Sequence, residues 1–225
     1  MRDTGGAAHA NLWWELIPSV TPSKLYLPLI LRDYHPITTV NIYSNLEDGE
    51  ALYSNCTPGW TACRNSSTGN ARWAGLQVST VGATYNSGGY QIQRAFLYFD
   101  TSSIPSNAII TDGKLMLYAG QWQNGSKIIH LVRSIAGIPL TAADYGRISF
   151  ESGGSVAFPA PYNWATINLN QAALSWIAKG NTTKLALIHD KDLANIAPTV
   201  TNDVLIATAE DTAHKPYLVL TYYLP

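Results

Sequence analysis

Short runs in which apolar and polar residues alternate recur along most of the chain, and they constrain its fold more than any other feature. In an extended strand this alternation places the apolar side chains on one face, as for Ala95, Leu97 and Phe99. Turn residues separate the runs, so many short strands are predicted. The expected strands are 38–43, 77–81, 91–99, 109–110, 114–118, 127–133, 157–158, 164–169, 184–189, 204–208 and 217–223.

A single segment, 170–179, has the pattern of a helix, which Asn168 or Asn170 can cap and Gly180 can end. The intervals 45–72 and 33–36 are expected to be a long loop and a linker. The fold class predicted from these patterns is all-β, an antiparallel, jelly-roll-like β-sandwich over residues 37–225 with one short helix. The residues expected in its core are Leu97, Phe99, Leu115, Leu117, Leu187, Leu218 and Leu220.

The extension formed by residues 1–36 contains one further strand signal. Leu25, Leu27, Leu29 and Leu31 alternate over 24–32 and would share one face of an extended strand. Pro28 lacks an N–H, so such a strand cannot pair on both sides along its whole length. We expect these leucines either to contact a neighbouring subunit or to fold back on their own domain. The first residues are polar and lack the apolar stretch of a signal peptide, so removal of a signal or a late start of the sequence are both open.

Charge excludes several function classes. Only 13% of residues are charged and the formal net charge is -1. Such a chain has no basic footprint for nucleic acid or for an anionic membrane surface. No apolar stretch is long enough for a transmembrane segment. A surface with so little charge also does little to prevent self-association.

The two cysteines give information on the cellular compartment in which the protein folds. Cys56 and Cys63 flank a Pro58-Gly59 turn that can bring them together. A disulfide in this short loop would indicate an oxidising compartment, and hence an extracellular or cell-surface protein. Two free thiols are the alternative.

Motifs for catalysis are missing from the sequence. The histidines have no metal-ligand spacing, and no nucleophile or nucleotide-binding motif occurs. We therefore expect no enzyme activity and no cofactor. The densest acidic cluster, with Glu47, Asp48 and Glu50, is a weak candidate for structural calcium and also fits an ordinary turn.

Aromatic residues in or near the expected loops are the other candidate site. Rings in such positions can stack on the C–H faces of sugars, or they can pack the loops onto the sandwich. The residues concerned are Trp60, Trp73, Tyr85, Tyr90 and Trp122.

Several segments together resemble the DNRLRE-type domain over residues 37–225. They are QRAFLYFDTSSIP at 93–105, AIITDGKLMLY at 108–118, DYG at 144–146, LNQAALSWIAKG at 169–180 and KPYLVLTY at 215–222. The resemblance implies a β-sandwich akin to jelly-roll carbohydrate-binding modules, found in secreted and in phage-encoded proteins. Most members of this family have no known activity, and some related modules bind polysaccharides.

Two hypotheses follow. The first is a non-enzymatic extracellular structural protein, a self-assembling filament or surface subunit, in which the strand at 24–32 joins a neighbouring subunit as a homo-oligomer or homopolymer. The second is a carbohydrate-binding or adhesive module, including a phage appendage, with a polysaccharide partner. The alternating leucines favour the first hypothesis, and the aromatic residues favour the second.

Overall fold

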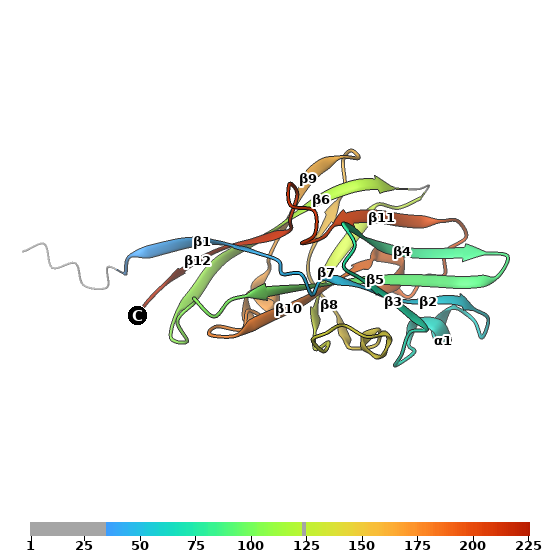
Figure 1. Cartoon of the computed structure of the whole chain (residues 1–225), viewed down its shortest axis with the longest axis horizontal. Coiled ribbons are helices and arrows are strands. Elements are labelled where there is room, and N and C mark those ends of the chain that lie inside the picture. The colour runs from blue at the N-terminus through green and yellow to red at the C-terminus, as the bar shows by residue number, and fades with distance from the viewer. Residues whose placement is uncertain (1–34, 123–124) are drawn as a thin grey trace, which may run out of the picture. The chain divides into compact units, whose positions relative to one another are not determined.

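Antiparallel β-strands build almost the whole fold, which we describe from a computed structural model for residues 35–122 and 125–225 (Figure 1). The leucine-containing strand expected at 24–32 lies outside the described residues. The strands are β1 (Ile37–Tyr43), β2 (Gly49–Cys56), β3 (Ala71–Ala74), β4 (Val78–Asn86), β5 (Gly89–Asp100), β6 (Ile109–Trp122), β7 (Ile128–Ser134), β8 (Ile148–Ala157), β9 (Asn163–Asn168), β10 (Thr182–His189), β11 (Asn202–Ala207) and β12 (Tyr217–Tyr223). The helices are α1 (Trp60–Arg64), α2 (Gln171–Ser175) and α3 (Asp190–Ala194).

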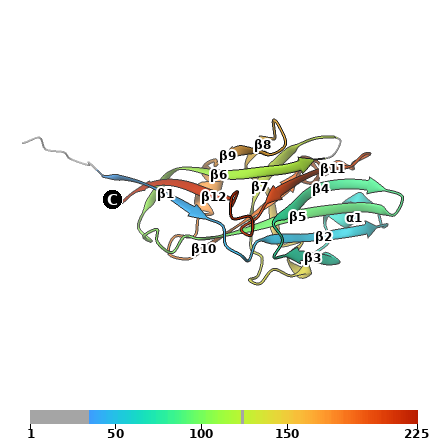
Figure 2. The same ribbon diagram turned by 45° about the horizontal axis from the view of Figure 1, so that its top comes forward.

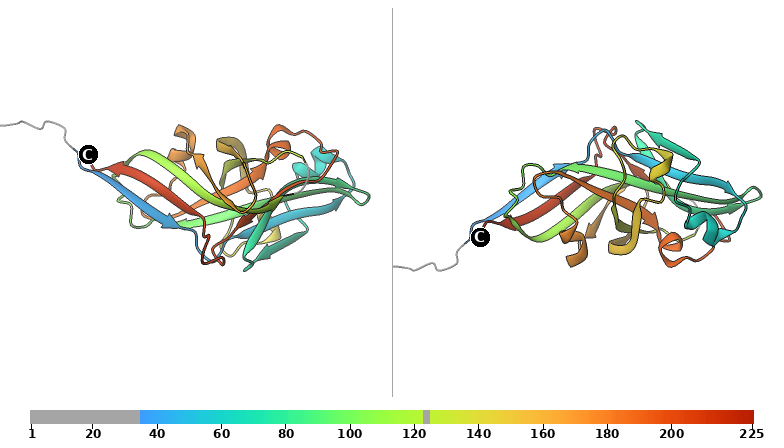
Figure 3. Two further views of the ribbon diagram at one scale, coloured as in Figure 1. Left: turned by 90° about the horizontal axis from the view of Figure 1, so that it is seen from above. Right: turned by 90° about the horizontal axis from the view of Figure 1, so that it is seen from below.

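The strands follow the order β1-β12-β6-β11-β4-β5-β10-β7-β8, with β2 and β3 added beside β5 and with β9 added beside β6. All strand pairs are antiparallel. Figure 2 shows β1 and β12 side by side at one end, and β2, β3 and α1 at the other. The short helices lie along one side in both views of Figure 3. The predicted all-β sandwich is therefore confirmed.

The main hydrophobic core lies between the two layers of the sandwich, and every predicted core residue belongs to it. In β12, Leu218 and Leu220 are fully buried, whereas Tyr217 and Val219, which alternate with them, are partly exposed. Ala95, Leu97 and Phe99 of β5 share the core-facing side, as the alternation predicts. Burial of one such leucine or phenylalanine stabilises the fold by about 1.5–3 kcal/mol.

A second core covers the opposite face of β5 and β10, so these strands are buried on both faces. Phe96 and Tyr98 of β5 pack there with Ile188 of β10, Trp60 of α1 and Tyr145. The 3-10 turn at Ala142–Asp144 holds Tyr145 in place, because the Asp144 carboxylate accepts hydrogen bonds from the backbone N–H and the hydroxyl of Thr141, both at 2.8 Å. The connection between β7 and β8 is held in this second core by Ala136, Leu140 and Tyr145.

The sequence-based prediction of a loop over 45–72 was wrong. That interval contains β2, α1 and the start of β3. β2 was missed because Glu50 breaks its apolar pattern, although this side chain is buried and hydrogen-bonded. β8 was also missed for most of its length, because Gly153 and Gly154 interrupt its pattern where β7 and β8 shift in register. Gly154 has φ +147° and its position faces the Asn168 carbonyl oxygen, so a larger residue would not fit.

The expectation of one helix also needs correction, because the described residues form three short helices. Asn170 caps α2 as predicted, and its Oδ1 accepts a hydrogen bond from the Ala173 N–H at 3.0 Å. The helix ends at Ser175 rather than at Lys179, and tighter turns continue the chain to Gly180, which has φ +74°. In the part of the chain that the structure describes, no helix has the length and apolar character needed to cross a membrane.

Candidate functional site

The disulfide predicted between Cys56 and Cys63 is confirmed. It joins the end of β2 to α1, and both cysteines are buried in the second core. The Pro58-Gly59 turn between them has Gly59 at φ +105°. The bond therefore fixes α1 against the sandwich and indicates an oxidising environment.

The aromatic residues selected from the sequence do not form one binding surface. Trp60 is 6% exposed and packs edge-on against Tyr90, with ring centroids 5.5 Å apart, so its role is packing. Tyr85 is half-exposed and lies 5.0 Å from Tyr90 at the β4–β5 hairpin. Trp73 is exposed on β3, and no ring contact of Trp73 occurs among the described residues. The side chain of Trp122 lies outside the described part of the structure.

The acidic residues considered for calcium have different environments. Glu47 is exposed, whereas Asp48 and Glu50 are buried. The Tyr98 backbone N–H donates to Asp48 Oδ1 at 2.9 Å, and the Gln93 amide donates to Glu50 Oε1 at 3.2 Å. Burial raises the pKa of Asp48 to about 8 and raises the pKa of Glu50 as well. Among residues 35–122 and 125–225, no group of three His, Cys, Asp or Glu side chains is arranged to hold a metal ion.

A buried ion pair that the sequence analysis missed connects β5 with α3. Arg94 Nε and Nη2 donate to the two carboxylate oxygens of Asp192 at 2.7 and 2.9 Å. The same guanidinium donates to the backbone carbonyl oxygens of Tyr145 and Arg64, both at 2.8 Å, and lies over the Tyr145 ring. Both charged side chains are almost fully buried. Because every one of these contacts is internal, the pair has a structural role.

Another set of rings gathers over the neighbouring strands β1, β12, β6 and β9, whose arrangement Figure 1 shows, and we call this set the aromatic face. Strand register explains how it forms, because Tyr43 is paired with Tyr217 and Tyr118 is paired with Trp164 across neighbouring strands. The loop before β12 adds His214, whose ring stacks on Tyr118 at 3.8 Å. The residues of the aromatic face are Tyr43, Tyr118, Tyr162, Trp164, His214 and Tyr217.

Contacts between the rings hold the aromatic face in one arrangement. The Trp164 centroid lies 5.5 Å from that of Tyr118 and 5.6 Å from that of Tyr217, in both cases edge-on. Tyr217 is 5.2 Å from Tyr43. Tyr43 is 55% exposed, Tyr162 is 59% exposed and Trp164 is 36% exposed, so apolar ring surface remains open to solvent. The rings are tilted relative to one another and do not form a flat plane.

Two hollows adjoin these rings. The larger, of about 560 Å³, is lined by Tyr43, Trp164, Thr212, Ala213, Lys215 and Tyr217. The smaller, of about 230 Å³, is lined by Val78, Tyr118, Gly120, Tyr162, Ala207, Asp211 and His214. The larger hollow is within the range of small-ligand sites, and both combine ring surface with a few polar groups.

The polar groups at the smaller hollow are held by hydrogen bonds. The Asp211 carboxylate lies 2.9 Å from His214 Nδ1 and also accepts from the backbone N–H groups of Ala213 and His214. These hydrogen bonds outweigh partial burial and lower the pKa of Asp211, so it is charged at neutral pH. The Gln121 amide donates to the Tyr162 hydroxyl at 2.5 Å, which fixes that exposed ring.

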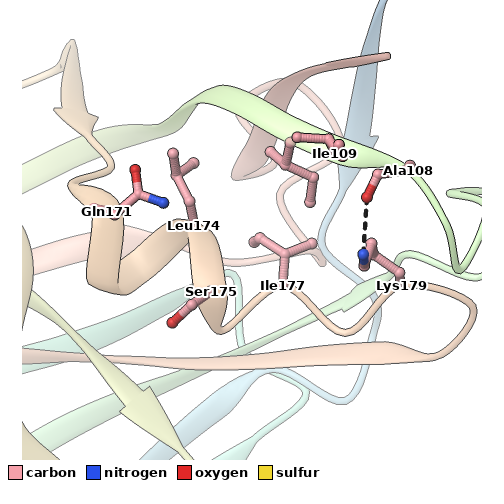
Figure 4. A pocket seen from close by; sticks show the side chains of 8 residues that line it. Ala108, Ile109, Gln171, Leu174, Ser175, Ile177 and Lys179 are labelled. Atoms are coloured by element: carbon pink, nitrogen blue, oxygen red, sulfur yellow. Dashed lines mark hydrogen bonds between the residues drawn. The ribbon is translucent and has the colours of Figure 1, made fainter. Parts of the chain in front are cut away.

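A separate hollow of about 290 Å³ lies between α2 and the start of β6 (Figure 4). Ile109, Ile110, Leu174 and Ile177 give it an apolar lining. On one side the Lys179 ammonium donates to the Ala108 carbonyl oxygen at 2.8 Å, so its charge is engaged. The Ser175 hydroxyl, which also lines the hollow, donates to the Ala172 carbonyl oxygen at 2.6 Å, so the apolar side chains offer the main free surface for a ligand.

Sequence reasoning missed the aromatic face because its rings are far apart in the chain, and four of them, Tyr43, Tyr118, Trp164 and Tyr217, lie within strands. Position alone would mark Tyr217 only as an outward-facing residue of β12. Comparison with known proteins adds nothing to this site, since no protein-family model and no curated protein matches the chain. The resemblance to DNRLRE-type domains therefore remains a prediction.

Proposed function

We propose that the protein is a non-enzymatic module that binds glycans through the aromatic face. One observation carries the proposal: partly exposed rings from separate strands gather beside two hollows with polar rims. A pyranose ring has an apolar face of C–H groups, which favours stacking on aromatic rings, and hydroxyl groups at its edge. Thr212 lines the larger hollow and His214 the smaller, and both can form hydrogen bonds with such hydroxyl groups.

The tilt between the rings favours a single chain or a short oligosaccharide over the flat surface of a crystalline polymer. Trp164 is turned by 67° from Tyr217 and by 71° from Tyr118, so a planar surface cannot stack on these rings at once. A flexible chain can turn between successive sugars and meet each ring in its own plane. The disulfide, which indicates an oxidising environment, supports an extracellular or cell-surface location for such a module.

Two matched tryptophan variants test the proposal. Both Trp164 and Trp73 are partly exposed on strands, but only Trp164 belongs to the aromatic face. Binding to a panel of soluble neutral and acidic polysaccharides is measured by affinity electrophoresis and calorimetry. Trp164→Ala should weaken binding at least about tenfold, which corresponds to ~1.4 kcal/mol, while Trp73→Ala leaves binding unchanged.

Thermal unfolding must first show that both variants fold, so that a loss of glycan binding can be assigned to the loss of the side chain. Absence of binding by the wild type to every glycan in the panel would refute the proposed function. If glycan binding survives Trp164→Ala but is lost in Trp73→Ala, the binding site is on β3, at one of the aromatic residues selected from the sequence, and the aromatic face is refuted as the site.

A second function, self-assembly, is favoured by the free edge of β1. Among the strands that the structure describes, β1 is at the end of the strand order and pairs only with β12. Ile37 is 73% exposed, and Thr38 and Thr39 next to it are also exposed. An open edge of this kind can accept an added strand. Ile37 is in register with Tyr223, which is in register with Ile109, so the apolar hollow beside α2 lies at the same end of the sheet.

We propose residues 24–32 of a second copy as the strand that is added. Their alternating leucines would supply apolar side chains for the hollow, and their backbone would pair with β1. Electron microscopy of the full chain should then show filaments, and deletion of residues 1–33 should give folded monomers. Full-length protein that is monomeric at high concentration would refute self-assembly, and filaments formed by the deleted chain would refute the role of this segment.

A further inference from the structure

We infer that the larger hollow of the aromatic face selects sugars that carry a carboxylate, and that Lys215 is the residue that determines this specificity. The inference rests on the proposed glycan binding and names its ligand class. Lys215 is the charged residue in the lining of this hollow, where the rings of Tyr43, Trp164 and Tyr217 supply the apolar surface.

The Lys215 ammonium has no partner in the described part of the structure. Within residues 35–122 and 125–225, its ammonium makes neither an ion pair nor a hydrogen bond. Lys179 and Lys184 differ in this respect, because their ammonium groups donate to carbonyl oxygens at 2.8 and 2.7 Å. Lys215 is also half-buried, so part of its side chain is shielded from water. A partly shielded cation beside apolar rings favours an anionic partner, which would supply the missing charge.

The two acidic residues of the same loop, Glu210 and Asp211, have other partners, and Glu210 accepts a hydrogen bond from the Thr208 hydroxyl at 2.8 Å. Asp211 accepts hydrogen bonds from His214 and from backbone N–H groups, and it lines the smaller hollow rather than the larger one. The low pKa of Asp211 keeps a negative charge beside the smaller hollow, which disfavours an anionic sugar there. The two hollows therefore differ in sign, with a free cation at the larger and a carboxylate at the smaller.

A uronic acid has the chemistry that this arrangement recognises. Its pyranose ring presents a C–H face for Trp164 or Tyr217, and its carboxylate extends from the edge of the ring toward a cation. Thr212 contributes a hydroxyl to the same hollow for a sugar hydroxyl. A neutral sugar would use the rings alone, so its affinity would not depend on the lysine charge. A sulfated sugar has the same sign of charge but a different geometry, and the experiment distinguishes it.

The test compares matched oligosaccharides by calorimetry. The probes are a galacturonic acid tetramer, its methyl ester, and a sulfated galactose tetramer. The ester keeps the sugar ring and removes the charge, so the wild type should bind the acid about tenfold more tightly, a difference of ~1.4 kcal/mol. Lys215→Met keeps the aliphatic stem without the charge and should abolish this preference. Lys215→Arg should retain it. Added salt should weaken binding of the acid to the wild type and to Lys215→Arg, but not to Lys215→Met.

Failure of the inference is distinguishable from failure of the proposed function. Equal binding of the acid and its ester by the wild type, or an unchanged preference in Lys215→Met, would overturn the role of the lysine while leaving glycan binding intact. Tighter, Lys215-dependent binding of the sulfated tetramer would overturn the assignment to carboxylates. A glycan panel in which neutral polysaccharides bind and no acidic one does would overturn the inference as well. Loss of all binding in Trp164→Ala, with the acid preference of the wild type intact, supports both proposals.

Discussion

Removal of the charge on Asp192 should destabilise the protein strongly while leaving the aromatic face intact. Asp192 is buried and accepts both hydrogen bonds from the Arg94 guanidinium, at 2.7 and 2.9 Å. Asp192→Asn keeps the size of the side chain but places an amide N–H₂ against an arginine N–H, and it leaves the buried cation without its counter-ion. Breaking a buried pair in this way costs about 3–5 kcal/mol. That is a large fraction of the ~5–15 kcal/mol by which a domain is stable.

The assay is urea unfolding followed by tryptophan fluorescence. The control is Arg147→Ala, because Arg147 is 54% exposed and lies 3.6 Å from Asp144, an arrangement in which an ion pair contributes less than about 1 kcal/mol. Replacement of both buried partners, Arg94→Met with Asp192→Leu, should cost less than Asp192→Asn alone, since Arg94 is then not left as an unpaired buried cation. Arg64, which lies 3.7 Å from the Asp192 carboxylate, keeps its hydrogen bonds to the backbone carbonyl oxygens of residues 192 and 193 in both variants. The reasoning is refuted if the free energy of unfolding of Asp192→Asn is within about 1 kcal/mol of the wild-type value. It is also refuted if the double variant is less stable than Asp192→Asn.

Three further predictions concern the core, the disulfide and pH. Leu117→Ala should lower the free energy of unfolding by about 2–5 kcal/mol, because the side chain is fully buried; a urea midpoint equal to that of the wild type would contradict this. Reduction of the Cys56–Cys63 bond should cost about 2–3 kcal/mol, and non-reducing mass spectrometry should find both cysteines in one linked peptide rather than as alkylated thiols. Asp48→Asn should reduce the loss of stability that the wild type shows between about pH 4 and about pH 8, which urea titrations across this range would measure.

The sequence predicted the fold class and the main core because period-two alternation reports which side chains point inward. It could not show that β5 is buried on both faces, since Arg94, Phe96 and Tyr98 on the second face include a charged and a hydroxyl-bearing residue. Arg94 looks like a surface residue until Asp192, 98 positions later, is brought against it. The helices α1 and α3 are each five residues long, too short for a periodic pattern to identify them.

The candidate site was less predictable than the fold for a related reason. Alternation tells which face of a strand is exposed, but not which strands lie next to each other. Tyr43 and Tyr217 become neighbours only because β1 pairs with β12, and Trp164 joins them only because β9 pairs with β6. Aromatic residues in expected loops were the visible signal, and the structure uses two of them, Trp60 and Tyr90, to pack the second core.

The pH prediction for Asp48 can be argued from its surroundings. Burial is the main reason that its pKa is raised to about 8, and the charge of Glu210 raises it further. Asp48 Oδ2 has no hydrogen-bond partner among residues 35–122 and 125–225, so the ionised carboxyl is poorly compensated. Because the folded pKa lies above the unfolded value of 3.8, the folded protein holds a proton that the unfolded chain has released, and rising pH therefore lowers stability by up to about 1.4 kcal/mol per unit within this window.

Asp48→Asn retains an oxygen that can accept the hydrogen bond from the Tyr98 N–H and carries no charge at any pH. The variant should therefore gain stability relative to the wild type as pH rises from about 4, and the difference should level off above about pH 8. Glu50, whose pKa is also raised by burial, contributes a slope of the same sign to both proteins and cancels in the comparison. If the free energy of unfolding changes with pH equally in the two proteins, Asp48 is ionised in the folded state throughout this range. Water or a cation would then have to reach this carboxylate, although the packing of β2 against β5 encloses it.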